Sequence, residues 1–204
     1  MDNLTDLQRT RLEQHKKMVL ETNRHMNLTA ITDPAEFDVK HIADSLTILP
    51  YIPQVEGIAL GDVGSGAGFP GIVLAIMRED IEIMLIDSLR KRVNFLHEVV
   101  QELGLVNVKA VHARAEDLAR EGVAFDICTA RAVASMDKLA KWVLPIVKPG
   151  GKFLAMKGPD VGAELEKAET VLRKKGGVVE SVDKVEIAEG IVHSVVVVRK
   201  NTSV

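Results

Sequence analysis

The feature that most restricts the fold of this chain is a run of glycines between residues 60 and 71. It reads Leu60-Gly-Asp-Val-Gly-Ser-Gly-Ala-Gly-Phe-Pro-Gly71 and separates two short apolar segments. Glycines at this spacing let a backbone turn tightly from a strand into a helix and approach a ligand closely. A plain glycine-rich turn would also account for one such pattern, so its interpretation depends on the rest of the chain.

Short apolar runs alternate with amphipathic stretches from residue 57 onward. The runs predict strands at Ile58–Val63, Ile81–Ile86, Val108–His112, Phe125–Thr129 and Lys152–Met156. The stretches predict helices at Gly71–Met77, Arg90–Leu103, Ser135–Val147, which Pro149-Gly-Gly151 stops, and Asp160–Lys175. Strands that alternate with helices form a parallel sheet through right-handed crossovers, with helices on both faces.

The C-terminal segment departs from this alternation. Val178–Ile187 and Ile191–Arg199 predict two strands with only the turn Glu189-Gly190 between them, so they are expected to form an antiparallel hairpin at the sheet edge. The chain is therefore expected to have an α/β fold with a mostly parallel, seven-stranded sheet. This is the Rossmann-like arrangement of class I methyltransferases, whereas a nicotinamide dehydrogenase domain usually ends on a sixth parallel strand.

The N-terminal segment predicts helices instead of strands. Residues 4–26 place apolar side chains loosely on one face, and Asp33-Pro34 is typical of a cap and first turn before a second helix at 35–49. We therefore expect a helical extension at 1–55, followed by a separate α/β domain at 56–204.

The glycine run fits two cofactor patterns. Gly66, Gly68 and Gly71 satisfy the dinucleotide pattern G-x-G-x-x-G. Asp62, Gly64 and Gly66, followed by Gly68, satisfy D-x-G-x-G-x-G, which is typical of S-adenosylmethionine sites.

Two acids bear on the choice of cofactor. Asp87 ends the second predicted strand, where a carboxylate can accept hydrogen bonds from ribose hydroxyls of either cofactor. Asp62 lies at the end of the first strand and can face a cationic amino-acid group, which S-adenosylmethionine has and NAD lacks. Together with the C-terminal hairpin, Asp62 favours S-adenosylmethionine. We therefore expect residues 56–204 to be an S-adenosylmethionine-binding methyltransferase domain.

Composition limits the other classes of function. The formal net charge of −3 argues against tight non-specific binding to a polyanion, although residues 7–28 and 173–175 are locally basic. The polar N-terminus and the short apolar runs predict a cytosolic protein without a membrane segment. Cys128 lies in a predicted buried strand and is expected to be inert, and the scattered histidines predict no metal site.

Several segments together resemble one family, the glucose-inhibited division protein B family of bacterial small-subunit ribosomal RNA guanine-N7 methyltransferases. The segments run in the family's order and cover nearly the whole chain: Asn27-Leu-Thr-Ala30, His41-Ile-Ala-Asp-Ser45, Asp62–Gly71, Asp87, Lys91-Arg92, Phe95-Leu96, Arg114-Ala-Glu116, Arg131-Ala132 and Lys157-Gly158. The Gly-Phe-Pro-Gly extension and the His-x-x-Asp-Ser element are far more specific than the glycines.

The resemblance implies roles for particular residues. Gly64 and Phe69 would contact the cofactor from the glycine loop, and Asp87 would hold the ribose. Ala115 and Glu116 would border the adenine, although Glu116 could simply begin a short helix.

The residues expected to position the substrate belong to less specific patterns, and several of them have an alternative structural explanation. Arg131 follows the fourth strand, where open α/β sheets place ligands, and would stand at the methionine end of the cofactor and the substrate mouth. Lys157 follows the fifth strand and could equally be a solvated lysine. His41, Asp44 and Ser45 share one helix face, where they either wall the substrate site or pin the helical extension to the main domain.

The resemblance implies methylation of N7 of a guanine in 16S ribosomal RNA, in the decoding region of the small subunit. The segment Thr129-Ala-Arg-Ala132 lacks the Asp/Asn-Pro-Pro-aromatic pattern common in enzymes that methylate exocyclic amines. Guanine N7 has an in-plane lone pair and needs no strong base. The alternatives are a methyltransferase of small molecules or proteins, a nicotinamide-dependent oxidoreductase, and a non-catalytic assembly factor. Nothing in the pattern demands more than a monomer.

Overall fold

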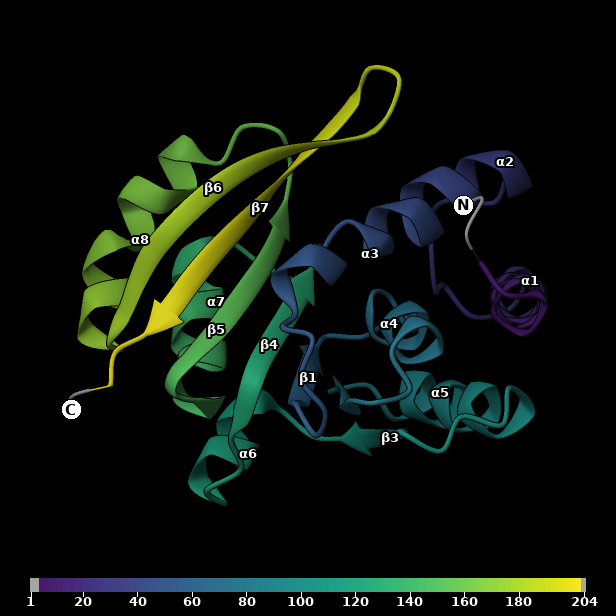
Figure 1. Ribbon diagram of the computed structural model, residues 1–204, viewed down its shortest axis with the longest axis horizontal. Helices are drawn as coiled ribbons and strands as arrows, with labels where there is room; N and C mark the ends of the chain where they lie inside the picture. The colour runs from purple at the N-terminus through teal and green to yellow at the C-terminus, as the bar shows by residue number, and fades with distance from the viewer. Residues whose placement is uncertain (1–3, 203–204) are drawn as a thin grey trace.

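The computed structural model describes residues 4–202, which form a seven-stranded sheet in the order β3-β2-β1-β4-β5-β7-β6 (Figure 1). Six strands run in one direction, and β7 is antiparallel to both of its neighbours. The strands are β1 Ala59–Val63, β2 Glu82–Asp87, β3 Val108–His112, β4 Phe125–Arg131, β5 Val147–Lys157, β6 Gly177–Ala188 and β7 Ile191–Lys200. The predicted fold class and the C-terminal hairpin are confirmed.

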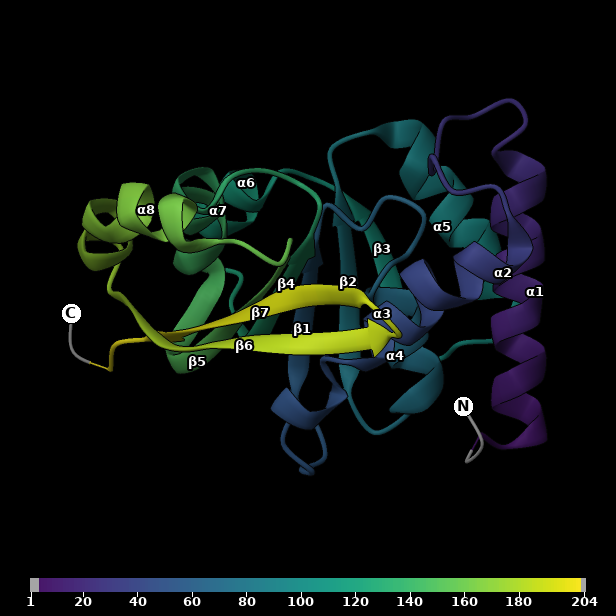
Figure 2. The ribbon, with the colours of Figure 1, turned by 90° about the horizontal axis from the view of Figure 1, so that it is seen from above.

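Helices cover both faces of the sheet. Figure 2 shows α6, α7 and α8 on one side of the strands and α1 to α5 on the other. Their bounds are α1 Asp6–Thr22, α2 Pro34–Phe37, α3 Asp44–Leu46, α4 Gly71–Met77, α5 Arg90–Glu102, α6 Ala115–Arg120, α7 Met136–Val143 and α8 Gly162–Lys174. None of the helices in residues 4–202 is long and apolar enough to cross a membrane.

The N-terminal extension is helical, as predicted, and shares the core of the sheet. A capping box between Thr5 and Gln8 begins α1, and the Asp33 carboxylate caps α2. The buried side chains of Leu12, Val19 and Phe37 belong to the same apolar cluster as Leu60 of β1. Because one core joins the two parts, the division at residue 55 stays a prediction.

The second predicted helix, at 35–49, is not a uniform α-helix. A π-helical turn, η1 Asp38–Ala43, separates α2 from α3, and a 3₁₀ turn, η2 Leu49–Tyr51, follows. π-Turns are rare and frequently occur at functional sites. This one carries His41 into the site described below.

The predicted end of the helix at Val147 is wrong. The α-helix α7 ends at Val143, and a 3₁₀ turn at Leu144–Ile146 (η3) leads directly into β5 at Val147. Pro145 explains the difference, because proline has no N–H to donate and its ring collides with the preceding turn. The stop expected from Pro149-Gly-Gly151 therefore lies inside the strand.

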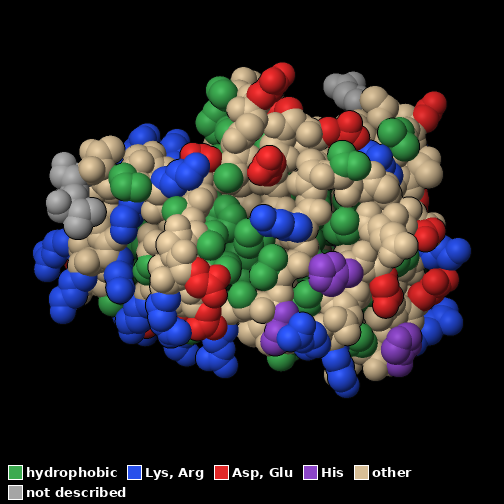
Figure 3. Space-filling view, turned by 90° about the horizontal axis from the view of Figure 1, so that it is seen from below, with side chains coloured by type: hydrophobic (Ala, Val, Ile, Leu, Met, Phe, Trp, Pro, Cys, Tyr) green, Lys and Arg blue, Asp and Glu red, His purple; other side chains and the backbone are tan. Residues whose placement is uncertain are grey.

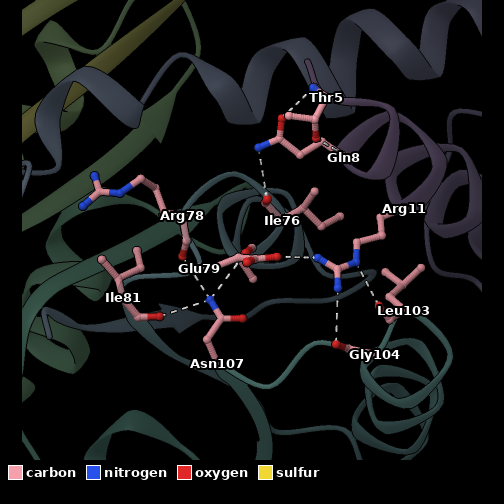
Figure 4. A network of polar contacts seen from close by, with 11 residues as sticks. Thr5, Gln8, Arg11, Ile76, Arg78, Glu79, Ile81, Leu103, Gly104 and Asn107 are labelled. Atoms are coloured by element: carbon pink, nitrogen blue, oxygen red, sulfur yellow. Dashed lines mark hydrogen bonds and ion pairs between the residues drawn. The ribbon is translucent and has the colours of Figure 1, made fainter. Parts of the chain in front are cut away.

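Two of the five Lys and Arg side chains of the basic segment at 7–28 are engaged within the protein, and the other three are exposed. Figure 4 shows Arg11 of α1 donating to the carbonyls of Leu103 and Gly104 and pairing with Glu79. The Arg11–Glu79 ion pair measures 2.6 Å. Lys16 pairs with Asp38 at 2.7 Å. These two cations attach α1 to the rest of the fold, so their charge is neutralised or hydrogen-bonded within the protein.

Candidate functional site

The glycine loop crosses from β1 to α4 in a conformation that few other residues adopt. Gly64, Gly66 and Gly68 have φ values of +74°, +57° and +97°. At Gly64 a Cβ would lie 2.5 Å from Cγ2 of Val133, so this position needs glycine for space as well as for backbone angle. The loop and the segment after β4 therefore approach each other more closely than side chains would permit.

Asp62 lies beneath this loop and not on its ligand-facing side. Its side chain is fully buried, accepting hydrogen bonds from the Gly71 amide at 3.1 Å and the Thr129 hydroxyl at 3.0 Å. Burial raises the pKa of Asp62 to about 6, although the hydrogen bonds from Thr129 and Gly71 act to lower it. Asp62 thus joins the two ends of the loop, and its contact with the amino-acid end of a cofactor stays a prediction.

Asp87 stands at the carboxyl end of β2 and lines a cavity. Its two oxygens accept from the amides of Gly66 at 3.0 Å and Leu89 at 2.9 Å, and Arg92 lies 3.7 Å away. A carboxylate offers about four acceptor positions. About two of them remain for ligand hydroxyls, as expected of a residue that binds ribose.

The cavity has a volume of about 400 Å³ and lies at the carboxyl ends of β1 to β4. The predicted residues Gly64, Asp87, Ala115 and Glu116 all line it. It is also lined by side chains that the sequence did not single out as cofactor contacts: Arg92, Arg114, Val133 and Trp142. Trp142 lies on α7, and only the tertiary structure brings it to this wall.

Backbone strain marks the wall of the cavity that follows β4. Ala132 has a φ of +54°, the only positive φ of a non-glycine residue in the described part of the chain. Such a conformation costs of order 1–3 kcal/mol and persists where the surroundings impose it. Arg131, directly before Ala132, is held by hydrogen bonds to Asp44 and His41, and backbone outliers of this kind cluster at functional sites.

Phe69 does not line the cavity. Its ring is 4% exposed and stacks between His15, with ring centroids 4.7 Å apart, and His41, at 4.6 Å. His15 also bonds to the Ala67 carbonyl at 2.8 Å, and burial lowers the pKa of His15 to about 4. Phe69 thus connects the glycine loop to the N-terminal helices, whatever further contact it makes with a ligand.

Arg131 is enclosed by the N-terminal extension. Its guanidinium donates to Asp44 at 2.7 Å, to Nδ1 of His41 at 2.9 Å and to the Lys40 carbonyl at 3.0 Å. Burial, followed by the positive charge of Arg131, lowers the pKa of His41 to about 4. His193 of β7 contacts the other oxygen of Asp44. The network joins three segments that are far apart in the sequence.

The other predicted substrate residues also have partners inside the protein. Ser45 is fully buried and donates to the His41 carbonyl at 2.6 Å. Lys157 donates to the Ala134 carbonyl at 2.9 Å and pairs with Glu164 at 2.7 Å. The Lys157 contact holds the backbone that follows β4. Cys128 is fully buried, and burial raises the pKa of its thiol, which is the setting of a structural cysteine.

The cavity fits an adenosine-like group. It combines a carboxylate with unused acceptor positions, at Asp87, with apolar walls at Ile86, Ala115 and Val133. Because residue 64 is glycine, the loop can lie close to Val133 in that wall. Groups of three or more His, Cys, Asp or Glu side chains arranged for a metal ion do not occur among residues 4–202.

A sheet of this order, with such a cavity over the carboxyl ends of its central strands, is the Rossmann-like fold that class I methyltransferases have. A solved SAM-dependent methyltransferase from Aquifex aeolicus is similar to 81% of this chain and to 93% of its own, with a TM-score of 0.57 and 21% identity. At that identity the likeness concerns the fold.

Sequence comparison narrows the class. Residues 8–192 match the model of the GidB family, rRNA small subunit methyltransferase G. Two relatives named ribosomal RNA small subunit methyltransferase G are similar: one from Lactobacillus delbrueckii subsp. bulgaricus, 46% identical over 85% of this chain and 75% of its own, and one from Clostridium perfringens, 45% identical over 91% and 80%. The chain belongs to the GidB family.

Proposed function

We propose that this protein transfers a methyl group from S-adenosylmethionine to N7 of a guanine in 16S ribosomal RNA, in the decoding region of the small subunit. Membership of a family whose relatives are named for small-subunit ribosomal RNA methylation carries the substrate assignment. The N7 position rests on the family resemblance and on the chemistry of the site.

The cavity residues would hold the cofactor. Asp87 would accept hydrogen bonds from the ribose hydroxyls, Ala115 and Glu116 would border the adenine, and Gly64 would let the loop approach the amino-acid end. Asp62 acts through the loop, by holding the Gly71 amide. When bound, S-adenosylmethionine supplies an electrophilic methyl group on a cationic sulfur.

The surrounding residues favour a reaction without a general base. The ring of His41 is uncharged at neutral pH, and both of its nitrogens have partners, Arg131 and the Thr29 hydroxyl at 2.7 Å. Guanine N7 carries a lone pair that needs no deprotonation, so alignment is the main requirement. The positive charge left on the purine is tolerated near Arg131 because Asp44 neutralises that guanidinium.

Arg131 and Lys157 are therefore proposed as positioning residues and not as phosphate ligands. Arg131 precedes the strained Ala132, and Lys157 holds the Ala134 carbonyl, so together they shape the segment that walls the cavity. Arg131→Ala is expected to lower the rate of methyl transfer and also the affinity for the cofactor, because both depend on the shape of this segment. An unchanged rate with unchanged cofactor affinity would remove this role.

The function is tested with small subunits from cells that lack this enzyme. Purified protein and cofactor labelled in the methyl group are added, the RNA is extracted with phenol, and its bases are separated after hydrolysis. The expected label is in 7-methylguanine from a single position of 16S RNA. Label in protein, in a small molecule or at another base position would overturn the proposal.

A further inference from the structure

Charge is distributed unevenly along this chain. Residues 1–131 contain 14 Lys and Arg against 20 Asp and Glu, a net −6, whereas residues 132–204 contain 12 against 9, a net +3. Figure 3, seen from the side of α6 and β3, shows basic side chains gathered at the end of the molecule formed by α7 and α8, on the left. The overall charge of −3 therefore conceals a basic region.

A hollow in this basic region is lined by lysines. Lys141 of α7 and Lys174 and Lys175 at the end of α8 surround it, and all three are exposed. Val171 and Trp142 complete the apolar part of its lining, and Glu116 is its one acidic side chain. Lys141 has only a loose ion pair, with Asp137 at 4.0 Å.

A further cation adds to the positive potential. Lys200 of β7 donates to the Lys175 carbonyl, and its pKa is lowered by burial and then by the charge of Lys175. The end of α8 thus concentrates like charges that repel one another. In a protein of negative net charge, such a concentration is the expected site of attraction for a polyanion.

The hollow shares a wall with the cofactor cavity. Trp142 and Glu116 line both, so a chain bound in the hollow lies directly beside the adenine end of the cavity. Trp142 is the only tryptophan of the chain. Because Trp142 lies between the two sites, a ligand that moves this side chain in the hollow also changes the wall of the cavity.

We propose that the hollow of Lys141, Lys174 and Lys175 binds backbone phosphates of the RNA substrate and holds that RNA beside the cofactor cavity. This proposal rests on the proposed function for the identity of the polyanion. Lysines act here as point charges that contact phosphates without reading bases, so they supply affinity and register while the methylated guanine is selected elsewhere.

The test compares two triple variants of equal charge. The first is Lys141→Gln/Lys174→Gln/Lys175→Gln, and the second changes three exposed lysines on other surfaces, Lys17, Lys109 and Lys184, to Gln. Binding of small ribosomal subunits is measured against salt concentration in the presence of S-adenosylhomocysteine. Affinity for S-adenosylhomocysteine and thermal melting are measured in parallel, because exposed substitutions should alter neither.

The hollow variant should lower the slope of log affinity against log salt by about 2, since each lost phosphate contact contributes about 0.7. Its KM for subunits should rise at least about tenfold, with kcat retained. An unchanged slope, an equal loss in the second variant, or no binding of subunits by the unaltered protein would overturn the proposal. Binding without methylation of any ribosomal RNA would refute the proposed function and leave the hollow supported.

Discussion

Acid should weaken the contact between α1 and the glycine loop, because His15 makes that contact while buried and uncharged. Its ring is 1% exposed, stacks on Phe69 and donates from Nε2 to the Ala67 carbonyl. Burial lowers the pKa of His15 from 6.5 to about 4, a change that the hydrogen bond to Ala67 only partly opposes. The unfolded chain therefore takes up a proton at higher pH than the folded protein does.

The sign and size of the effect follow from this difference in pKa. A base that has a lower pKa in the folded state loses stability as pH falls through the interval from 6.5 to about 4. Between pH 7.5 and pH 5, His15 should account for about 2 kcal/mol of lost unfolding free energy, and for about 3 kcal/mol once pH is below 4.

Two other buried groups titrate in the same range. His41 has its pKa lowered to about 4 and adds to the loss, whereas Asp62 has its pKa raised to about 6 and opposes it by about 1 kcal/mol at pH 5. The total pH dependence of the unaltered protein therefore mixes three groups. Only a difference between variants isolates His15.

The variant His15→Gln keeps a donor for the Ala67 carbonyl and removes the titration. Unfolding in urea is followed at pH 7.5 and pH 5, and the loss of free energy between the two should be about 2 kcal/mol smaller than in the unaltered protein. His97→Gln, on an exposed position of α5, is the control and should leave the loss unchanged. Equal losses in His15→Gln and in the unaltered protein would refute the reasoning.

Three further predictions concern the site. Gly64→Ala should weaken S-adenosylhomocysteine binding by about 1–3 kcal/mol, measured by calorimetry, because the new Cβ meets Val133. Gly57→Ala is the control: its φ is also positive, at +75°, but a Cβ there meets open space, so this variant should bind normally. Asp87→Asn should weaken the same binding about 10- to 100-fold, and unchanged affinity would show that the ribose is held elsewhere. Asp44→Ala should lower the unfolding free energy by about 3–5 kcal/mol, since it leaves the Arg131 charge buried without its partner, and a loss below about 1 kcal/mol would contradict that account.

Local patterns in the sequence were sufficient for the fold and for one edge of the site. The alternation of apolar runs, the cap at Asp33-Pro34 and the turn at Glu189-Gly190 depend on neighbouring residues, and each prediction is confirmed. Asp87 was placed correctly on the cavity because the end of a parallel strand has a fixed location in this fold. Pro145 is an equally local signal for the end of a helix, and the prediction of one helix over 135–147 did not take it into account.

The partners of the charged side chains could be decided only by the tertiary structure. Arg131 and Asp44 are 87 residues apart, and a pattern of nearby residues cannot show that one neutralises the other. The same holds for Trp142, which reaches the cavity only because α7 packs beside the carboxyl ends of the strands. Long side chains can point in several directions from the same backbone, so whether a charge is free for a ligand or already paired depends on the distant segments packed around it.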